Sequence, residues 1–318
     1  MTLYLKYRPQ TINEIDITAV RESLINILKS GNIAHAFLFS GPRGIGKTSL
    51  ARILAKAINC EKLSKDNEPC NRCSKCTSIT NGNNIDVIEM DAASNRGIDD
   101  IRNLRDQVKL APSSSKSKVY IIDECHMLTT EASNALLKTL EEPPSHVYFI
   151  LATTNPEKLP ETVKSRVTLI QFSKATDGEI LRCLKRVVEG EKIKISETDL
   201  TKIVKISKGS FRDAVKTLER YSVDSSFLNL DQNSDISNLV ELIVNKELDK
   251  ALEIVKKSNN IENLTDQIIE NLHQRILVSK SKELIPLIEF ILTSKDMVRY
   301  SPIEELPLEL SLIKWCRI

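Results

Sequence analysis

Residues 41–48 read Gly41-Pro42-Arg43-Gly44-Ile45-Gly46-Lys47-Thr48, which matches the pattern G-x-x-x-x-G-K-[ST] without a departure. The apolar run 36–39 precedes this motif, and a helical pattern of apolar positions runs from Leu50 to Ala57 after it. A buried strand, a glycine-rich turn and a helix N-terminus together form a phosphate-binding loop, because backbone N–H groups and the helix dipole then face the phosphates. A chance glycine-rich turn is the alternative, and the flanking strand and helix disfavour it.

The residues of this loop have separate expected roles. Lys47 is expected to reach the β- and γ-phosphates of a nucleotide, and the Thr48 hydroxyl is expected to bind Mg²⁺. The remaining residues expected to contact the nucleotide here are Gly41, Gly44, Gly46 and Ser49. The sequence therefore predicts a nucleoside triphosphate and Mg²⁺ as ligands.

A second apolar run, 119–122, ends in the adjacent acids Asp123 and Glu124. Such a strand would deliver Asp123 to the Mg²⁺ ion and would place Glu124 where its carboxylate can polarise the attacking water. Adjacent acids at a strand end are also common surface features, but the upstream phosphate loop favours the functional interpretation. His126 completes the string Asp-Glu-Cys-His, which is superficially like a helicase box. The helical remainder offers no second motor domain, so a helicase is a poor fit.

Polar and cationic side chains follow further along the chain. The apolar run 147–152 leads to Thr154 and Asn155, either of which can hold the water near the γ-phosphate, although an ordinary strand-end turn is the alternative. Arg166 and Arg212 can stabilise the charge that develops during phosphoryl transfer. A lone arginine is usually a solvated surface charge, so this role depends on the motifs that precede it.

Four of the seven cysteines lie in a polar segment between the phosphate-loop helix and the next predicted strand. Cys60, Cys70, Cys73 and Cys76 have the spacing C-x9-C-x2-C-x2-C. Four thiolates form a structural zinc site with no open position for catalysis. A disulfide pair is disfavoured because the rest of the sequence is typical of an intracellular protein, and a redox C-x2-C would leave two cysteines unexplained. We expect a zinc-binding insertion over about 60–76.

Composition and patterning set wider limits on the chain. It has 318 residues and a formal charge of +2, which gives no reason by itself to invoke nucleic acid. No apolar run approaches the roughly 18 residues that a membrane span needs, and no secretory signal follows Met1, so we expect a cytoplasmic protein. Uniformly apolar strands alternate with helical patterns over 1–172, which predicts a parallel sheet covered by helices. We expect a small helical domain over 173–223 and a further helical domain over 224–318.

Together, these motifs resemble the ATPase subunits of bacterial clamp loaders, the gamma/tau family of DNA polymerase III. The resemblance runs strongly from about Leu3 to Tyr221 and beyond that only in helical character. Besides the phosphate loop and the cysteine spacing, it is carried by Tyr7-Arg8-Pro9, His35 to Gly41, Ala51 to Lys56, Asp91 to Ser94, Val119 to Leu128, Asn134 to Pro144 and Leu151 to Thr154. Related delta-prime-like subunits often lack a working phosphate loop, so the intact loop favours the motor subunit.

The resemblance implies a P-loop NTPase of the AAA+ class, with an α/β ATPase domain, a helical lid and an all-α collar for oligomerisation. It implies that ATP lies at subunit interfaces and that Arg166 acts as an arginine finger on the neighbouring subunit's nucleotide. Arg212 would contact the phosphates of its own subunit. The residues that fall where the family lines its adenine pocket are Tyr7, Arg8 and Pro9.

The same resemblance implies partners and a task. Subunits of this family assemble with delta and delta-prime subunits and with copies of themselves, open a sliding clamp and place it on primed DNA, which the assembly binds. Two alternatives are a different AAA+ remodelling ATPase acting on DNA or protein, and a scaffold in which ATP is only a structural ligand. The mass of the oligomer with and without delta subunits separates the first alternative, and turnover of Glu124→Gln separates the second.

Overall fold

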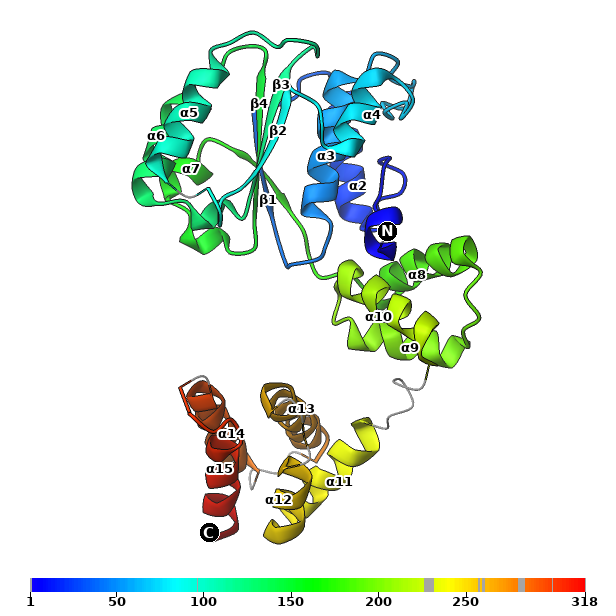
Figure 1. Cartoon of the computed structure of the whole chain (residues 1–318), viewed down its shortest axis with the longest axis vertical. Coiled ribbons are helices and arrows are strands. Elements are labelled where there is room, and N and C mark those ends of the chain that lie inside the picture. Colours follow the sequence, from blue (N-terminus) through cyan, green and yellow to red (C-terminus); the bar gives the residue numbers. More distant parts are fainter. Residues whose placement is uncertain are drawn as a thin grey trace. The chain divides into compact units, whose positions relative to one another are not determined.

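The computed structural model describes residues 2–95, 97–225, 232–256, 258, 261–279, 284–298 and 300–317. The chain divides into two compact units, Met1–Ser225 and Ser226–Ile318, which are described separately (Figure 1). The finer division into three domains, at 172 and 223, stays a prediction.

The first unit is built on a parallel sheet. Its described strands are β1 (Ala36–Ser40), β2 (Val87–Asp91), β3 (Lys118–Asp123), β4 (Val147–Thr153) and β5 (Thr168–Gln171). They lie in the order β2-β3-β4-β1-β5, and each neighbouring pair is parallel. Every residue of β1 is buried, as expected for a central strand covered on both faces. Strand β5 was not predicted, because three of its four residues are exposed and it lacks a continuous apolar run.

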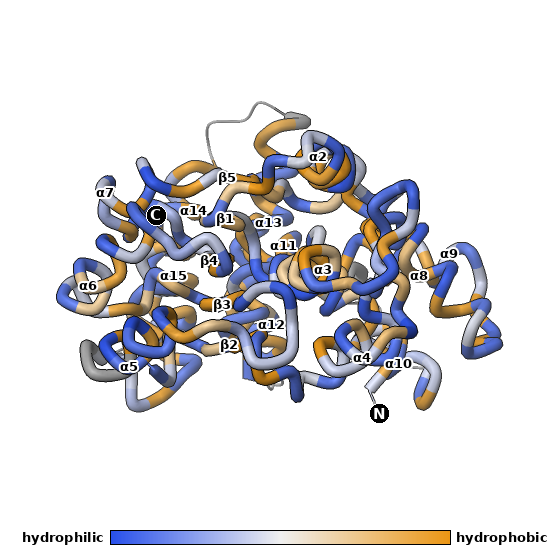
Figure 2. The backbone as a smooth tube through the Cα atoms, turned by 90° about the horizontal axis from the view of Figure 1, so that it is seen from above, coloured by the Kyte–Doolittle hydropathy of each residue, from blue (hydrophilic) through white to orange (hydrophobic). Residues whose placement is uncertain are grey.

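Helices cover both faces of this sheet (Figure 1). The helices on one side are α2 (Thr18–Lys29), α3 (Lys47–Asn59) and α4 (Ser74–Asn81), and those on the other are α5 (Ile98–Val108), α6 (Thr130–Glu141) and α7 (Glu161–Lys164). Short 3-10 turns follow two strands, η1 at Cys125–Met127 and η2 at Pro156–Lys158. Hydrophobic and hydrophilic residues alternate along α2 (Figure 2), so that its hydrophobic residues form one face of the helix, which packs on the core.

A group of helices completes the first unit: α1 (Leu3–Lys6), α8 (Asp177–Glu191), α9 (Glu197–Ile206) and α10 (Phe211–Val223). Thr176 and Glu179 form a capping box at the start of α8, and the hydroxyl of Ser210 accepts a hydrogen bond from a backbone N–H at the start of α10. These caps fix where the helices begin. The start of α10 contacts the glycine loop, because the Arg212 N–H donates to the Gly44 carbonyl at 3.2 Å.

In its described residues, the second unit consists of helices joined by turns and loops. Its helices are α11 (Gln232–Val244), α12 (Leu248–Lys256), α13 (Ile261–Ser279), α14 (Ile285–Val298) and α15 (Leu306–Arg317). They share one apolar core, in which the Trp315 indole N–H donates to the Ile243 carbonyl at 2.9 Å. In the described parts of both units, no helix combines the length and the apolar character that crossing a membrane requires.

Candidate active site and metal centre

A cavity of about 850 Å³ opens beside the glycine loop in the first unit. Its lining includes residues at or just after the carboxyl ends of β2, β3 and β4, and the loop that follows β1. Ligands of open parallel α/β sheets bind at this edge, since the strand ends and helix N-termini meet there. The topology therefore brings together motifs that are more than 100 residues apart in the sequence.

Two glycines of the loop have conformations that other residues rarely adopt. Gly44 has φ +75° and Gly46 has φ +104°, and Gly46 caps the N-terminus of α3. A Cβ atom on Gly44 would lie 2.2 Å from the Ser210 hydroxyl oxygen. A Cβ atom on Gly41 would lie 2.4 Å from the Phe172 carbonyl oxygen. Glycine at 41 and 44 therefore allows the segment after β5 and the start of α10 to pack directly on the loop.

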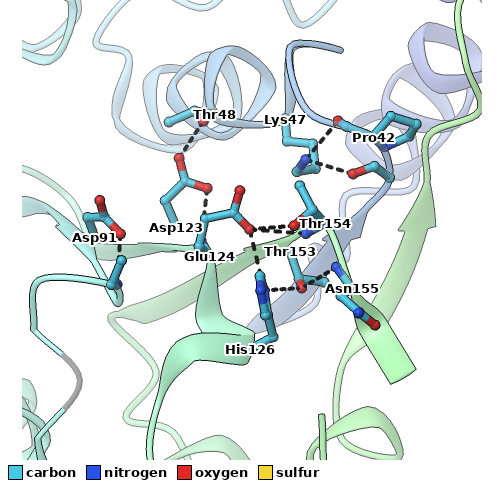
Figure 3. Close-up of polar contacts among 12 residues, drawn as sticks. Pro42, Lys47, Thr48, Asp91, Asp123, Glu124, His126, Thr153, Thr154 and Asn155 are labelled. Carbon is cyan, nitrogen blue, oxygen red and sulfur yellow. Dashed lines mark hydrogen bonds and ion pairs between the residues drawn. The ribbon is translucent and has the colours of Figure 1, made fainter. Parts of the chain in front are cut away.

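Lys47 lies at the first position of α3 with its side chain turned back over the loop (Figure 3). Its ammonium donates to the carbonyls of Gly41 at 2.8 Å and Pro42 at 2.9 Å. Burial lowers the pKa of Lys47, while the nearby carboxylates of Glu124 and Asp123 act in the opposite direction. The structure thus holds a cation beside the loop, and the hydrogen-bond acceptors that it contacts in the described chain are two neutral carbonyls.

Asp123 ends β3 and Glu124 follows it, and both point into the cavity region between the loop and β4 (Figure 3). The Thr48 hydroxyl donates to Asp123 Oδ2 at 2.7 Å, so the two predicted Mg²⁺ ligands are adjacent. Glu124 has φ +47°, a left-handed conformation that costs a non-glycine residue about 1–2 kcal/mol. This backbone turn aims the Glu124 side chain at the end of β4.

Glu124 is held by groups that follow β4. Its Oε2 accepts hydrogen bonds from the Thr154 hydroxyl at 2.9 Å and from the Thr154 N–H at 3.2 Å. His126 Nδ1 lies 3.4 Å from the same oxygen and 3.0 Å from the buried Thr153 hydroxyl. Asn155 is placed differently. Its backbone N–H donates to the Thr153 hydroxyl, and Asn155 is not among the residues that line the cavity in the described chain. Of the two polar candidates, Thr154 is the one that contacts Glu124.

The N-terminal residues predicted for the adenine pocket line the same cavity, namely Tyr7, Arg8 and Pro9. Arg8 Nε donates to the Ser49 hydroxyl at 2.8 Å, which joins this segment to the first turn of α3. Burial lowers the pKa of Arg8 to about 10, and the Arg52 guanidinium acts in the same direction. Arg8 therefore remains a half-buried cation at neutral pH.

The two candidate arginines lie in different places. Arg212 lines the cavity, and its guanidinium lies 5.7 Å from the centre of the Tyr4 ring. Arg166 is not among the residues that line the cavity in the described chain. Its Nε instead donates to Glu141 at 2.6 Å, at the end of α6. Within one chain, Arg212 is therefore close to the phosphate loop and Arg166 is engaged elsewhere.

The site contains residues that the sequence did not single out as functional. His126 was noted only as part of an acidic string, and nothing in its spacing indicated its contacts with Glu124 and Thr153. Tyr4 belongs to a four-residue helix, and its position against Arg212 depends on the packing of α1 on α10. The contacts of Tyr4 with Arg212 and of His126 with Thr153 join segments that are distant along the chain, and the contact of His126 with Glu124 depends on a local turn. The periodicity of apolar residues predicts none of these contacts.

The four clustered cysteines form a separate centre. The Sγ atoms of Cys60, Cys70, Cys73 and Cys76 all lie within 4.8 Å of one another. A tetrahedral zinc ion with Zn–S bonds of about 2.3 Å needs sulfurs roughly 3.8 Å apart, so this set fits such an ion after small adjustments. All seven cysteines are free thiols.

Backbone N–H groups around this centre favour the thiolate form, while burial raises the pKa of Cys60 and Cys76 in the opposite direction. The N–H of Cys70 points at Cys60 Sγ, that of Cys73 at Cys70 Sγ and that of Cys76 at Cys73 Sγ, at 3.3, 3.3 and 3.5 Å. The N–H groups of Arg72 and Cys73 lower the pKa of Cys70 to about 6, because hydrogen bonds to sulfur favour its charged form. The donor set and its geometry are therefore compatible with zinc.

Several known proteins similar to this chain are subunits of DNA polymerase III. A family model described as "DNA polymerase III, delta subunit" matches residues 18–176. DNA polymerase III subunit tau of Bacillus subtilis is 42% identical over 301 residues, which are 94% of this chain and 52% of the relative. DNA polymerase III subunit gamma of Buchnera aphidicola (subsp. Baizongia pistaciae) is 37% identical over 299 residues, covering 89% of this chain and 80% of the relative. The chain thus spans about half the length of the tau relative.

A solved structure shows the same fold at lower sequence identity. The RuvB Holliday junction branch migration motor of Thermotoga maritima has a TM-score of 0.50 and 18% identity, covering 87% of this chain and 82% of that one. At this identity the likeness concerns the fold alone, and it confirms the predicted fold class of a parallel α/β sheet followed by helical parts. The matches to the gamma and tau relatives carry the family assignment, so the chain belongs to the DNA polymerase III gamma/tau family.

Proposed function

We propose that this chain is the ATPase subunit of a bacterial clamp loader, which binds and hydrolyses ATP to place a sliding clamp on primed DNA. One observation supports this most strongly: a single cavity gathers the charged and polar groups that phosphoryl transfer needs, in a chain of the gamma/tau family. These groups are Lys47, Thr48, Asp123, Glu124 and Thr154.

Each of these residues would have a separate role in ATP hydrolysis. The loop N–H groups and the Lys47 ammonium bind the phosphates, and Glu124 orients and polarises the attacking water. Mg²⁺, when bound, would neutralise charge on the phosphate oxygens. Thr48 and Asp123 would hold this ion, because their oxygens are 2.7 Å apart and Mg²⁺ prefers hard oxygen ligands. Thr154 keeps the Glu124 carboxylate oriented through two hydrogen bonds.

The remaining roles concern the assembly. We infer that Arg212 contacts the phosphates bound by its own chain and that Arg166 acts on the nucleotide of a neighbouring subunit. The relatives are named as subunits of DNA polymerase III, which supports an assembly with other subunits of that enzyme. We propose delta and delta-prime subunits, further copies of this chain, the sliding clamp and primed DNA as its partners, in the cytoplasm. Zinc bound by the four cysteines would cross-link and stabilise the insertion.

An ATPase assay tests this function directly. Turnover by the isolated chain should be slow, and adding delta subunits, sliding clamp and primed DNA together should raise it severalfold or more. Glu124→Gln should bind ATP and lose this stimulated turnover. If turnover of wild type and Glu124→Gln both equal background, ATP is a structural ligand and the proposal is wrong. Full stimulation by DNA without clamp or delta subunits would instead favour a remodelling ATPase.

A further inference from the structure

The segment that follows α1 lines the nucleotide cavity in part, and residues outside that cavity hold it in place. We call residues 7–14 the N-terminal strap; Tyr7, Arg8 and Pro9 at its start line the cavity. The strap follows α1 and belongs to no described helix or strand. Within the strap, the Glu14 carboxylate accepts hydrogen bonds from the N–H groups of Gln10 and Thr11. Other segments must supply partners for the remaining backbone groups if the strap is to keep one position.

Lys56 supplies one set of partners. This residue of α3 is 1% exposed, and its ammonium donates to the Gln10 carbonyl at 2.7 Å and to Gln10 Oε1 at 2.9 Å. The same ammonium donates to Asn71 Oδ1 at 2.8 Å. Asn71 lies between Cys70 and Cys73, and its own side-chain N–H donates to the Gln10 carbonyl at 3.3 Å. One buried cation thus joins the strap to the turn that carries the cysteines.

Glu68 supplies a second set. Its two carboxylate oxygens accept hydrogen bonds from the backbone N–H groups of Ile12 and Asn13, each at 2.8 Å. Glu68 lies two residues before Cys70, within the insertion. The contact places an anion of the insertion on two strap N–H groups that no neighbouring strand satisfies, and Ile12 is 1% exposed beneath it. Charge-assisted hydrogen bonds of this kind are about twice as strong as neutral ones.

We propose that Lys56 and Glu68 are positioning residues that hold the strap at the nucleotide cavity, so that the metal-bound insertion sets the affinity for nucleotide. This inference rests on the proposed ATP-binding function and assigns a task to the cysteine centre within it. The insertion has no described helix or strand between Cys60 and Cys73, so its order depends on the cysteine cluster. Loss of that order would release Glu68 and Asn71 from the strap together.

The expected size follows from the fraction of molecules with the strap in place. If the strap occupies its position in only a tenth of the molecules, the apparent Kd for nucleotide rises about tenfold. Neither Lys56 nor Glu68 lines the cavity in the described chain, so neither contacts the reacting phosphates. Their effect should therefore be on nucleotide binding, through the position of the strap. Hydrogen exchange at the amides of Ile12 and Asn13 should rise with it, since those amides lose their acceptor.

The test measures the Kd of the full-length chain for a non-hydrolysable ATP analogue with Mg²⁺, together with hydrogen exchange over residues 8–14. Lys56→Met and Glu68→Ala should each raise Kd about tenfold and speed exchange at residues 12 and 13. Lys118→Met is the matched control, because Lys118 is also a buried lysine, 7% exposed, and donates to the Gln107 carbonyl, away from the strap. This control should leave the Kd unchanged.

Metal removal gives the second arm. A zinc-selective chelator, used with Mg²⁺ held in excess, should raise the Kd of wild type by a similar factor. It should add little in the Lys56→Met, Glu68→Ala double variant, because the connection is already broken. Should Glu68→Ala, at a half-exposed position, fold with its four thiols metal-bound and bind the analogue as tightly as wild type, the inference is overturned. Equal extra loss on chelation in wild type and double variant also overturns it. If wild type itself fails to bind the analogue, the proposed function fails instead.

Discussion

At the scale of single residues, the position of the Glu124 carboxylate depends on Thr154. The Thr154 hydroxyl and N–H both donate to Glu124 Oε2, and only the hydroxyl can be removed by substitution. Thr154→Val keeps the shape of the side chain, so we expect nucleotide affinity to stay within about twofold and turnover to fall by up to about a hundredfold, as for other misplaced catalytic groups. Steady-state ATPase kinetics in the stimulated assembly and a nucleotide-binding titration measure the two effects.

Thr154→Ser is the control for this prediction, because serine retains the donor and loses only a methyl group. It should keep most of the turnover. Equal loss in the serine and valine variants would mean that packing of the methyl group, and not the hydrogen bond to Glu124, is what matters at this position.

The role of a residue could be predicted from the sequence where the residue belongs to a known motif. It could not be predicted where the contact forms only on folding. The spacing around Lys47 and the acids at the end of an apolar strand were sufficient to place Lys47, Asp123 and Glu124 at one cavity. Lys56 offered no such signal, because a lysine in the middle of a helix is ordinarily solvent-exposed. Its burial follows from acceptors on Gln10 and Asn71, which lie 46 and 15 residues away.

At the scale of elements, the loop before β3 is tied to β2 by a buried carboxylate. Asp86 is fully buried, and it accepts hydrogen bonds from the N–H groups of Ser113, Ser114 and Ser115 at 2.7–2.8 Å. Burial by itself raises the pKa of Asp86, but the three N–H donors together outweigh it, and the pKa is lowered. Asp86→Asn leaves some of these donors without an acceptor, so we expect a loss of about 1–3 kcal/mol in the free energy of unfolding.

The loss at Asp86 should depend on pH. A lowered folded-state pKa contributes stability that is present above the unfolded-state pKa, about 3.9, and disappears as pH falls through the folded-state value. The difference between wild type and Asp86→Asn should therefore be constant from pH 7 to 5 and shrink at lower pH, measured by urea unfolding at each pH. Glu22→Gln, at an exposed position on α2, should show little difference at any pH. A wild-type advantage that persists unchanged in acid would contradict the assignment.

Strands could be predicted where they are buried on both faces, because such strands appear in the sequence as continuous apolar runs. The runs 36–39, 119–122 and 147–152 were identified because central strands of a parallel sheet are apolar on both faces. Strand β5 was missed, since of its four residues only Ile170 is buried and the backbone pairing with β1 alone defines it. Edge strands of this kind depend on a neighbour that the local sequence does not reveal.

At the scale of the whole molecule, the two units should separate binding from assembly. Every residue that lines the cavity, from Tyr4 to Val215, belongs to the first unit, and the second has its own apolar core. A chain that ends at Ser225 should bind the ATP analogue with a Kd within about twofold of the full chain's, because an affinity that depends only on intact cavity contacts is unchanged. It should lose self-association in analytical ultracentrifugation. Self-association equal to that of the full chain would contradict the collar role predicted for 224–318.

The position of Arg166 leads to a prediction that only the assembly can reveal. Its guanidinium is paired with Glu141 and lies outside the lining of its own cavity, whereas Arg212 lies in that lining. Arg212→Ala should therefore weaken nucleotide binding by the isolated chain, and Arg166→Ala should not. In the assembly with delta subunits, clamp and DNA, Arg166→Ala should lower turnover by about a thousandfold, the lower end for an arginine finger. Arg166→Lys should not restore this turnover, because one ammonium cannot reproduce the two-pronged guanidinium contact. Unchanged stimulated turnover in Arg166→Ala would leave the pair with Glu141 as a structural contact between α6 and the segment before β5.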